Sequence, residues 1–277
     1  MITFSQYQRV MSSFANNDIL SQPINSLRVM GPTLGALFIK HDVEDRLDRA
    51  VSMGLIEAKM GHRATYYFQA DLVASEEGRT AVQELAALGH EVGYHYDVLD
   101  AADGDYDAAL EDFDRCLGMF ANMGMPVSTV CPHGNPTKLR QGWKSNKDFF
   151  RNPIVRARYP NILDIVVDFP NLCPEGIYIS DAGFQLRIIN HIATNDQSNE
   201  TAIADGQPVA WGGLSSILGD AKCLVLSVHP HRLEHSAFRL YSRRVVFYGL
   251  KKFYSRVKFV PFMREFANRF YRVTRRF

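Results

Sequence analysis

Cysteine is scarce in this sequence and never occurs in closely spaced pairs. Four cysteines are spread over 277 residues and none stands in a C-x-x-C motif, so the sequence predicts neither a zinc ribbon nor a dithiol redox centre. Isolated cysteines are typical of reduced, buried thiols in a reducing compartment. We therefore expect four free thiols and a cytoplasmic protein, the residues being Cys116, Cys131, Cys173 and Cys223.

Several motifs of common function classes are also missing. The glycines form no phosphate loop, since G-P-T-L-G at 31–35 lacks the lysine and the spacing, and no G-x-S-x-G nucleophile elbow occurs. Nucleotide-driven and serine-hydrolase chemistry are therefore disfavoured. The first 20 residues lack a cationic start before an apolar block, and no run approaches the roughly 18 apolar residues of a membrane span. A soluble chain without a secretion signal is expected.

Charge of either sign is not in excess overall, but it is unevenly distributed. Residues 239–277 hold twelve Lys/Arg and one acidic residue, a net +11, which leaves −10 on the preceding 238 residues. Aromatic and aliphatic residues alternate with the cations, a pattern typical of amphipathic helices at anionic membrane surfaces. The alternative is that the apolar face packs on the body or across a dimer. The acidic body argues against a nucleic-acid partner, and we predict two units, 1–238 and 239–277.

Seven short segments rich in Val, Ile, Tyr and Phe alternate with helical patterns. Because parallel strands require crossover connections, this alternation predicts an α/β fold with a parallel sheet. Residues 3–17 form a further amphipathic pattern, expected to plug the bottom of the sheet structure or to pack on its side. The predicted strands are 36–42, 64–70, 90–97, 127–134, 162–169, 176–183 and 222–230.

Five of these seven strands end in histidine or aspartate. Functional residues of a β/α barrel gather at the carboxyl ends of many strands, whereas an open sheet uses mainly one crevice. We therefore expect a distorted, seven-stranded (β/α) barrel with a C-terminal basic helical tail. Imidazole and carboxylate groups together favour a divalent-metal site or acid–base chemistry. The strand-end histidines are His41, His95, His133, His229 and His231.

The ordered strand-end motifs resemble those of the polysaccharide deacetylase family, the NodB-homology domains, which form distorted β/α barrels. F-I-K-H-D-V-E takes the place of the family's T-F-D-D-G, and G-H-E-V-G-Y-H-Y-D that of G-H-E-I-G-N-H. V-C-P-H-G replaces R-x-P-Y-G, and V-L-S-V-H-P matches a late apolar run ending in histidine. The resemblance covers residues 34–232, and it is nearest to a divergent branch found among bacterial surface-polysaccharide biosynthesis proteins.

The resemblance implies a metal-dependent hydrolase, with zinc as the expected ion. Its substrate is expected to be an N-acyl group, above all N-acetyl, on an amino sugar in a glycan or lipid-linked precursor. Asp42 matches the family's metal-ligand aspartate and His95 its first metal histidine. The second histidine is replaced by Leu99, for which His133 or Asp97 is the expected substitute.

The resemblance also implies the acid–base residues. His41 stands where the family has its catalytic aspartate, Glu44 is a rival base, and His229 matches the general acid. The backbone N–H of His133 is expected to help form the oxyanion hole. Expected substrate contacts, each with a structural alternative as core filler, helix cap or solvated side chain, are Tyr94, Tyr96, Asp181, His231 and Arg232.

Two departures from the family pattern keep other functions open. Leucine replaces a metal histidine at position 99, and histidine replaces the catalytic aspartate at position 41. A non-catalytic barrel that binds a glycan or a partner protein during polysaccharide assembly is therefore the alternative. Hydrolysis of another C–N bond by the same barrel is a further possibility.

Overall fold

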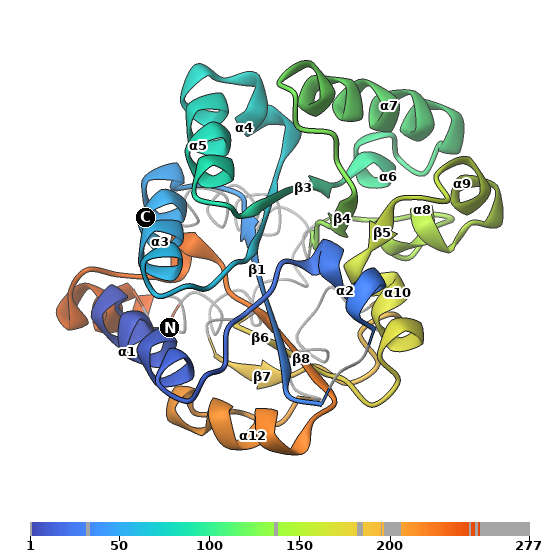
Figure 1. The fold of residues 1–277 in the computed structure, drawn as a ribbon. Coiled ribbons are helices and arrows are strands. Elements are labelled where there is room, and N and C mark those ends of the chain that lie inside the picture. Colours follow the sequence, from blue (N-terminus) through green and yellow to red (C-terminus); the bar gives the residue numbers. More distant parts are fainter. Residues whose placement is uncertain are drawn as a thin grey trace.

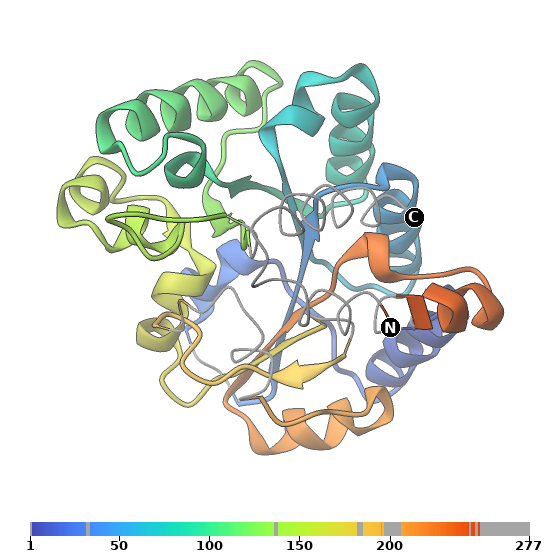
Figure 2. The same cartoon turned by 180° about the vertical axis from the view of Figure 1, so that it is seen from behind.

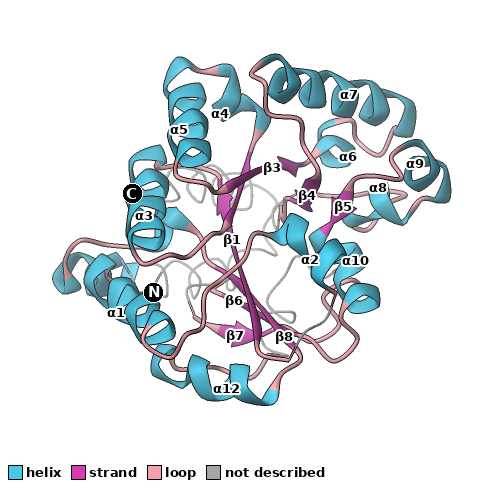
Figure 3. Cartoon of the chain, in the orientation of Figure 1, coloured by secondary structure: helices cyan, strands magenta, loops and turns pink. Residues whose placement is uncertain are grey.

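The computed structural model describes residues 2–31, 34–135, 138–181, 185–194, 196, 206–243, 245–246 and 249. Its centre is one curled sheet in the order β5-β4-β3-β2-β1-β8-β6-β7, with helices around the outside (Figures 1 and 3). Within the described ranges, six strand pairs are parallel and the β6–β7 pair is antiparallel. The strands are β1 (Ala36–Val43), β2 (Thr65–Phe68), β3 (Glu91–Tyr96), β4 (Thr129–Pro132), β5 (Leu163–Asp164), β6 (Ile177–Ser180), β7 (Arg187–Ile188) and β8 (Cys223–Ser227).

The predicted α/β barrel-like fold is confirmed, with two corrections to its strands. The sheet has eight strands rather than seven, because β7 adds a short antiparallel edge. The segment 162–169 is mostly helical: β5 ends at Asp164, and α10 (Ile165–Leu172) follows at once. The Asp164 side chain accepts hydrogen bonds from the Val166 and Val167 amides and so starts the helix. A short apolar run does not by itself distinguish strand from buried helix.

Helices cover the outer face of the sheet, and the view from behind shows the same ring (Figure 2). Along the chain all but the last of them lie between consecutive strands, as the crossover connections of a parallel sheet require. They are α3 (Leu47–Lys59), α4 (Ala70–Ala74), α5 (Glu76–Ala87), α6 (Val98–Ala101), α7 (Tyr106–Asn122), α8 (Lys147–Arg151), α9 (Pro153–Arg158), α12 (Leu214–Asp220) and the 3-10 turns η3 (Trp211–Gly213) and η4 (Pro230–Arg232).

The amphipathic pattern near the N-terminus forms α1 (Phe4–Ala15), which begins with a capping box between Thr3 and Gln6. Its buried face lies on the side of the barrel against α3 (Figure 1), which decides between the two expected placements. The bottom of the barrel is instead covered by η1 (Ile24–Ser26) and α2 (Leu27–Met30). The Ile24 amide donates to Thr65 Oγ1 at the start of β2, at 2.7 Å.

The sheet separates two hydrophobic cores, and the alternation of side chains along β1 shows which is which. Leu37 and Ile39 belong to the larger core between the sheet and the helices. Phe38 belongs to a smaller core that includes Tyr67 and Val225 and fills the barrel interior. Successive strand residues point to opposite faces, so even-numbered positions of β1 face the interior. This alternation decides which polar side chains of β1 point into the barrel and which point toward the helices.

The expectation of four free thiols is wrong for one pair. Cys173 and Cys223 form a disulfide with their Cα atoms 6.8 Å apart, while Cys116 and Cys131 are free and buried. The two bonded cysteines are 50 residues apart in sequence, so only the packing of α10 beside β8 brings them together. Among the described residues, no helix is both long enough and apolar enough to cross a membrane. Of the expected tail, 239–277, the structure describes residues 239–243, 245–246 and 249, and the rest lies outside the described residues.

Candidate functional site

Two histidines and one carboxylate meet at the carboxyl ends of β1, β3 and β4. Glu44 Oε1 lies 3.6 Å from His95 Nε2 and 3.5 Å from His133 Nε2. The two imidazole rings stand edge to face with their centroids 5.2 Å apart. One ligand atom from each of the three residues falls within 4.8 Å of the others. This spacing suits a single ion held between three side chains.

The hydrogen bonding of His95 leaves one ring nitrogen free to coordinate a metal ion. Its Nδ1 lies 3.0 Å from the carbonyl oxygen of Cys131, and a carbonyl only accepts, so Nδ1 carries the proton. The Nε2 atom is therefore the unprotonated nitrogen. It is buried and has no hydrogen-bond partner. A buried acceptor without a partner is costly in an apolar setting, and metal coordination would remove that cost.

A second grouping, of Asp42, His95 and Cys131, is also compact enough to hold a metal ion. Here, however, the Lys40 ammonium already lies between two of the three groups, 2.6 Å from Asp42 Oδ1 and 2.9 Å from Cys131 Sγ. Burial raises the pKa of the Cys131 thiol well above its ordinary value, so the metal-binding thiolate form is disfavoured. The grouping around Glu44 therefore fits a metal ion better.

Asp42 lies between the cluster of Glu44, His95 and His133 and a further histidine, His229, which follows β8. Its Oδ2 is 3.5 Å from His229 Nε2, and its other oxygen is bonded to Lys40. Burial alone would raise the pKa of the Asp42 carboxyl, but the Lys40 ammonium beside it holds that pKa well below its usual range. Asp42 is thus a buried, ionised carboxylate, whereas Glu44 takes the place beside the histidines that had been expected for Asp42.

His229 is oriented by Asp181, which was expected among the substrate contacts. Its Nδ1 lies 2.6 Å from Asp181 Oδ1, so Nε2 is turned toward Asp42. Arg232 Nη1 donates to the same Asp181 oxygen at 3.1 Å. Burial alone would raise the pKa of Asp181, but Arg232 and His229 lower it well below its ordinary value. Arg232 therefore supports the Asp181–His229 pair, rather than standing alone as an anion clamp.

His41 does not join the cluster, although the resemblance pointed to it as a base. It lies on the outer face of β1, opposite to Lys40 and Asp42. Its Nε2 is 2.7 Å from Glu57 Oε1 and its Nδ1 is 2.8 Å from the Val228 carbonyl. Both ring nitrogens are engaged away from the interior, so a role as the proton acceptor does not fit this position.

Three further expectations fail for reasons of strand geometry. Tyr94 and Tyr96 flank His95 and so point to the outer face, where both are buried against Phe113. They are core residues and cannot stack on a sugar. The His133 amide donates to the Tyr96 carbonyl at 2.7 Å, continuing the β3–β4 pairing, so it is not available for an oxyanion hole.

The structure distinguishes between His133 and Asp97, the two residues expected to replace the missing ligand at position 99. Leu99 is fully buried in the core. His133 presents Nε2 to Glu44, whereas Asp97 lies behind the same ring, 3.8 Å from Nδ1, with its side chain 47% exposed. Burial alone would raise the pKa of Asp97, but its contact with His133 lowers it. His133 is therefore the ligand candidate and Asp97 the group that orients it.

His231 lies at the rim of the same site. Its ring is 5.5 Å from that of His229, it is 5% exposed, and its Nδ1 has no hydrogen-bond partner. Burial lowers its pKa well below the ordinary histidine value, so the ring is neutral. Lys40 and Cys131 were not expected from the sequence; Lys40 is two residues before Asp42 on one strand, and that period-two spacing could have revealed it.

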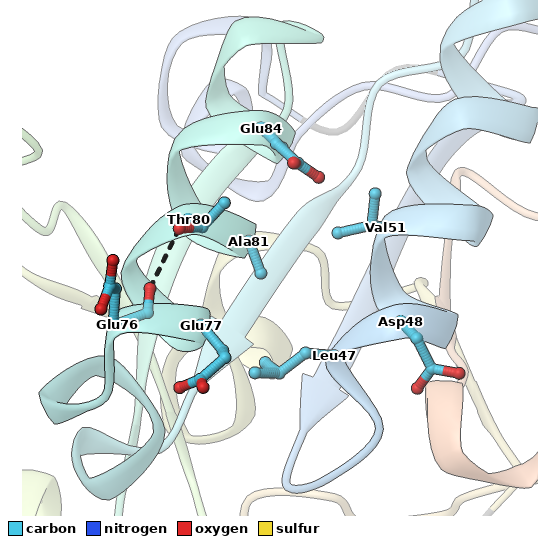
Figure 4. Close-up of a pocket in the computed structure, with 8 residues that line it drawn as sticks. All are labelled: Leu47, Asp48, Val51, Glu76, Glu77, Thr80, Ala81 and Glu84. Carbon is cyan, nitrogen blue, oxygen red and sulfur yellow. Dashed lines mark hydrogen bonds between the residues drawn. The ribbon is translucent and has the colours of Figure 1, made fainter.

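A separate surface groove lies between α3 and α5, and none of the histidines of the cluster lines it (Figure 4). Its floor is apolar and its walls carry four carboxylates, but it contains no histidine, cysteine or lysine. Thr80 at this groove bonds to the Glu76 carbonyl within its own helix, at 3.0 Å. We assign it no part in the chemistry. The lining residues are Leu47, Asp48, Val51, Glu76, Glu77, Thr80, Ala81 and Glu84.

No protein-family model matches the chain, and no curated protein matches it either. Among solved structures it resembles a Streptococcus mutans CE4 esterase at 13% identity and a TM-score of 0.44, over 84% of this chain and 89% of that one. It also resembles the catalytic domain of a peptidoglycan N-acetylglucosamine deacetylase from Eubacterium rectale, at 12% identity and a TM-score of 0.42, over 78% and 84% of the two chains.

A mutant of the peptidoglycan deacetylase PdaC from Bacillus subtilis is similar at 11% identity and a TM-score of 0.38, over 71% of this chain and 89% of that one. The printed descriptions of these three structures name a CE4 esterase and two peptidoglycan deacetylases. The structural neighbours are thus of the kind that the strand-end motifs resemble. Similarity at this level assigns neither a substrate nor a residue role to the chain.

Proposed function

We propose that this protein is a divalent-metal-dependent hydrolase that removes an N-acyl group, in the first place N-acetyl, from an amino sugar of a glycan or glycan precursor. One observation carries the proposal: a cluster suited to a metal and an acid–base pair share a single site. His95 belongs to both halves, because its ring lies within 4.8 Å of ligand atoms of Asp42 as well as of Glu44. The amino-sugar substrate follows from the resemblance of the strand-end motifs.

Glu44, His95 and His133 are the residues that would hold the metal. Two imidazoles and one carboxylate form a donor set that zinc accepts at catalytic sites, with a further position left for water or substrate. A bound zinc ion polarises a carbonyl group and lowers the pKa of a water molecule. Asp97 on the far side of the His133 ring would fix that ring's orientation.

Asp42 is the proposed general base. The Lys40 ammonium keeps its carboxylate ionised, and only the ionised form can accept a proton from the attacking water. It lies inside the barrel, where little bulk water competes. This exchanges the roles expected for Asp42 and Glu44, since Glu44 stands beside the two histidines and Asp42 beside the acid.

His229 is the proposed general acid. Asp181 holds its Nδ1 proton, so the proton delivered to the departing amine comes from Nε2, the nitrogen that faces Asp42. The attacking water therefore loses one proton to Asp42, and the leaving nitrogen gains one from His229. His231, neutral and buried beside His229, is proposed to contact a substrate hydroxyl or acyl group.

Residues 239–277 are proposed to hold the protein at an anionic membrane surface, where a lipid-linked precursor would be available. The net charge of +11 supports this, together with the exposed apolar side chains at its described beginning. Those side chains are Tyr241, Val245 and Val246, and Phe238 just before the tail is exposed as well. We place the enzyme on the cytoplasmic face.

Metal analysis and acyl release test the function together. The purified protein is expected to bind one zinc ion and to release acetate from N-acetylglucosamine oligomers. His95→Ala should lose both properties, and His229→Ala should lose release while keeping the metal. His235→Ala, which removes an exposed histidine outside the site, is the matched control. Wild-type protein that binds no divalent ion at saturation would end the proposal, and glycan binding without release would favour the non-catalytic alternative.

A further inference from the structure

A second polar cluster is buried on the outer side of β1, where no chemistry has yet been assigned. Its centre is the Glu57 carboxylate of α3, which is fully buried. Tyr66 of β2 donates to Glu57 Oε2 at 2.8 Å, and Tyr7 of α1 donates to Oε1. His41 approaches the same Oε1 at 2.7 Å. Four elements of the fold therefore contribute to one carboxylate inside the hydrophobic core.

The proton positions in this cluster follow from its partners. The Val228 carbonyl can only accept, so His41 Nδ1 carries a proton. Burial alone would raise the pKa of Glu57, but His41 and the other donors hold it at about 2, so Glu57 is a carboxylate. Burial and the Glu57 charge raise the pKa of both phenols, which remain donors. Both nitrogens of His41 therefore donate, one to Glu57 and one to Val228.

The position of this bridge links it to the site on the other face. His41 directly precedes Asp42, and Val228 directly precedes His229. The β1–β8 pairing ends at Lys40 and Ser227, so the side-chain bond from His41 to Val228 continues the connection one residue beyond the sheet. Asp42 and His229 then approach to 3.5 Å on the inner face. The Val228 amide also donates to the Lys40 carbonyl at 3.0 Å, so His41 adds a second bond at the point where these two strand ends part.

We propose that His41, anchored by Glu57, is a positioning residue that sets Asp42 against His229. In catalytic terms this rests on the proposed function, because it takes Asp42 and His229 as the base and the acid. The geometric part concerns only the two strand ends. Without the bridge, the segment after β8 can move relative to β1, and the two side chains lose their spacing. Displacements of about 1 Å remote from the reacting atoms can cost about 100-fold in rate.

Two variants break the bridge in different ways. His41→Ala removes it, whereas His41→Gln keeps one amide N–H that can reach the Val228 carbonyl. We expect kcat to fall about 10- to 100-fold in His41→Ala with KM and zinc content unchanged, and to recover in part in His41→Gln. Glu57→Gln, which cannot accept from both tyrosines and His41 together, should behave like His41→Ala.

Glu91→Gln is the matched control. It also removes a buried carboxylate, one bonded to Thr65 and Thr129 at the opposite ends of the strands. It should lose stability but keep wild-type kcat per folded molecule. A fall in kcat of the same size in Glu91→Gln and His41→Ala would mean that general destabilisation, not positioning, explains the effect.

A measurement without substrate separates this inference from the proposed function. In protein labelled with 15N-histidine, the His229 Nδ1 proton bonded to Asp181 gives a resonance that reports the setting of that ring. We expect it to shift in His41→Ala and to remain in place in Glu91→Gln. An unchanged resonance in a folded His41→Ala protein overturns the positioning role whether or not the wild type hydrolyses anything. Wild-type protein without acyl release, but with the shift, overturns only the function.

Discussion

The ion pair between Lys40 and Asp42 allows a quantitative test that needs no substrate. Its atoms Nζ and Oδ1 are 2.6 Å apart, and the two side chains are 1% and 9% exposed. Coulomb attraction at this distance is about 6 kcal/mol for an effective dielectric constant of about 20. Desolvation of both charges offsets much of this, so the pair adds little net stability, but removal of one partner leaves a buried, uncompensated charge.

We therefore expect Lys40→Met to lower the free energy of unfolding by about 3 to 5 kcal/mol. This is a large part of the roughly 5 to 15 kcal/mol that stabilises a typical domain. The double variant Lys40→Met with Asp42→Asn removes both charges and should recover most of the loss. Urea denaturation of the metal-free proteins, followed by circular dichroism, measures all three.

Lys147→Met is the control for this cycle. Lys147 is partly buried and donates to the Ile192 carbonyl at 2.8 Å, and desolvation lowers its pKa to about 8. Its replacement removes a partly buried lysine but does not touch Asp42, and it should not be rescued by Asp42→Asn. If the Lys40→Met and Asp42→Asn double variant is no more stable than the less stable single variant, the two charges are not coupled and the reasoning is refuted.

Three further predictions concern Glu57, the metal ligands and the basic tail. The pKa of Glu57 is held at about 2 against an ordinary 4.5, which contributes about 3 kcal/mol to the free energy of unfolding. This contribution is present above pH 4.5 and is lost as the pH falls toward 2, so Glu57→Gln should flatten that part of a profile of urea stability against pH. Glu44→Gln should weaken zinc binding more than about 10-fold in competition with a chelator, whereas Asp42→Asn should keep the zinc and lose acyl release; the reverse result would restore the expected roles. Removal of residues 244–277 should abolish sedimentation with phosphatidylserine vesicles that is itself weakened by salt, and equal binding to neutral vesicles would contradict an electrostatic attachment.

Much of the fold could be predicted because its signals are local. Each of the seven expected strands overlaps an observed strand, and the buried face of α1 consists of the four residues at helical spacing, Phe4, Tyr7, Met11 and Phe14. Side-chain periodicity depends only on the backbone of one element, so it is readable from a single segment. The extension of β5 failed because Ile165–Leu172 is apolar in either conformation.

The sequence predicted at which end of the sheet these polar side chains gather, but not which of them lie next to one another. The gathering of histidines at strand ends followed from parallel topology, and Glu44, Asp42, His95, His133 and His229 do meet there. Because successive side chains of a strand point to opposite faces, His41 cannot share a face with Asp42, nor can the two flanking tyrosines share one with His95. The roles expected for these residues came from aligning the motifs with the family and did not take this alternation into account.

The sequence by itself determined the strands, the helical face of α1, the end of the sheet where polar residues gather and the charge of the tail. Only the tertiary structure decided that Lys40 neutralises Asp42, that Glu57 holds His41, and that Cys173 meets Cys223. The difference has one physical reason. Periodicity is a property of neighbouring residues, whereas each of these pairings depends on how distant segments of the chain pack against one another, which no single segment encodes.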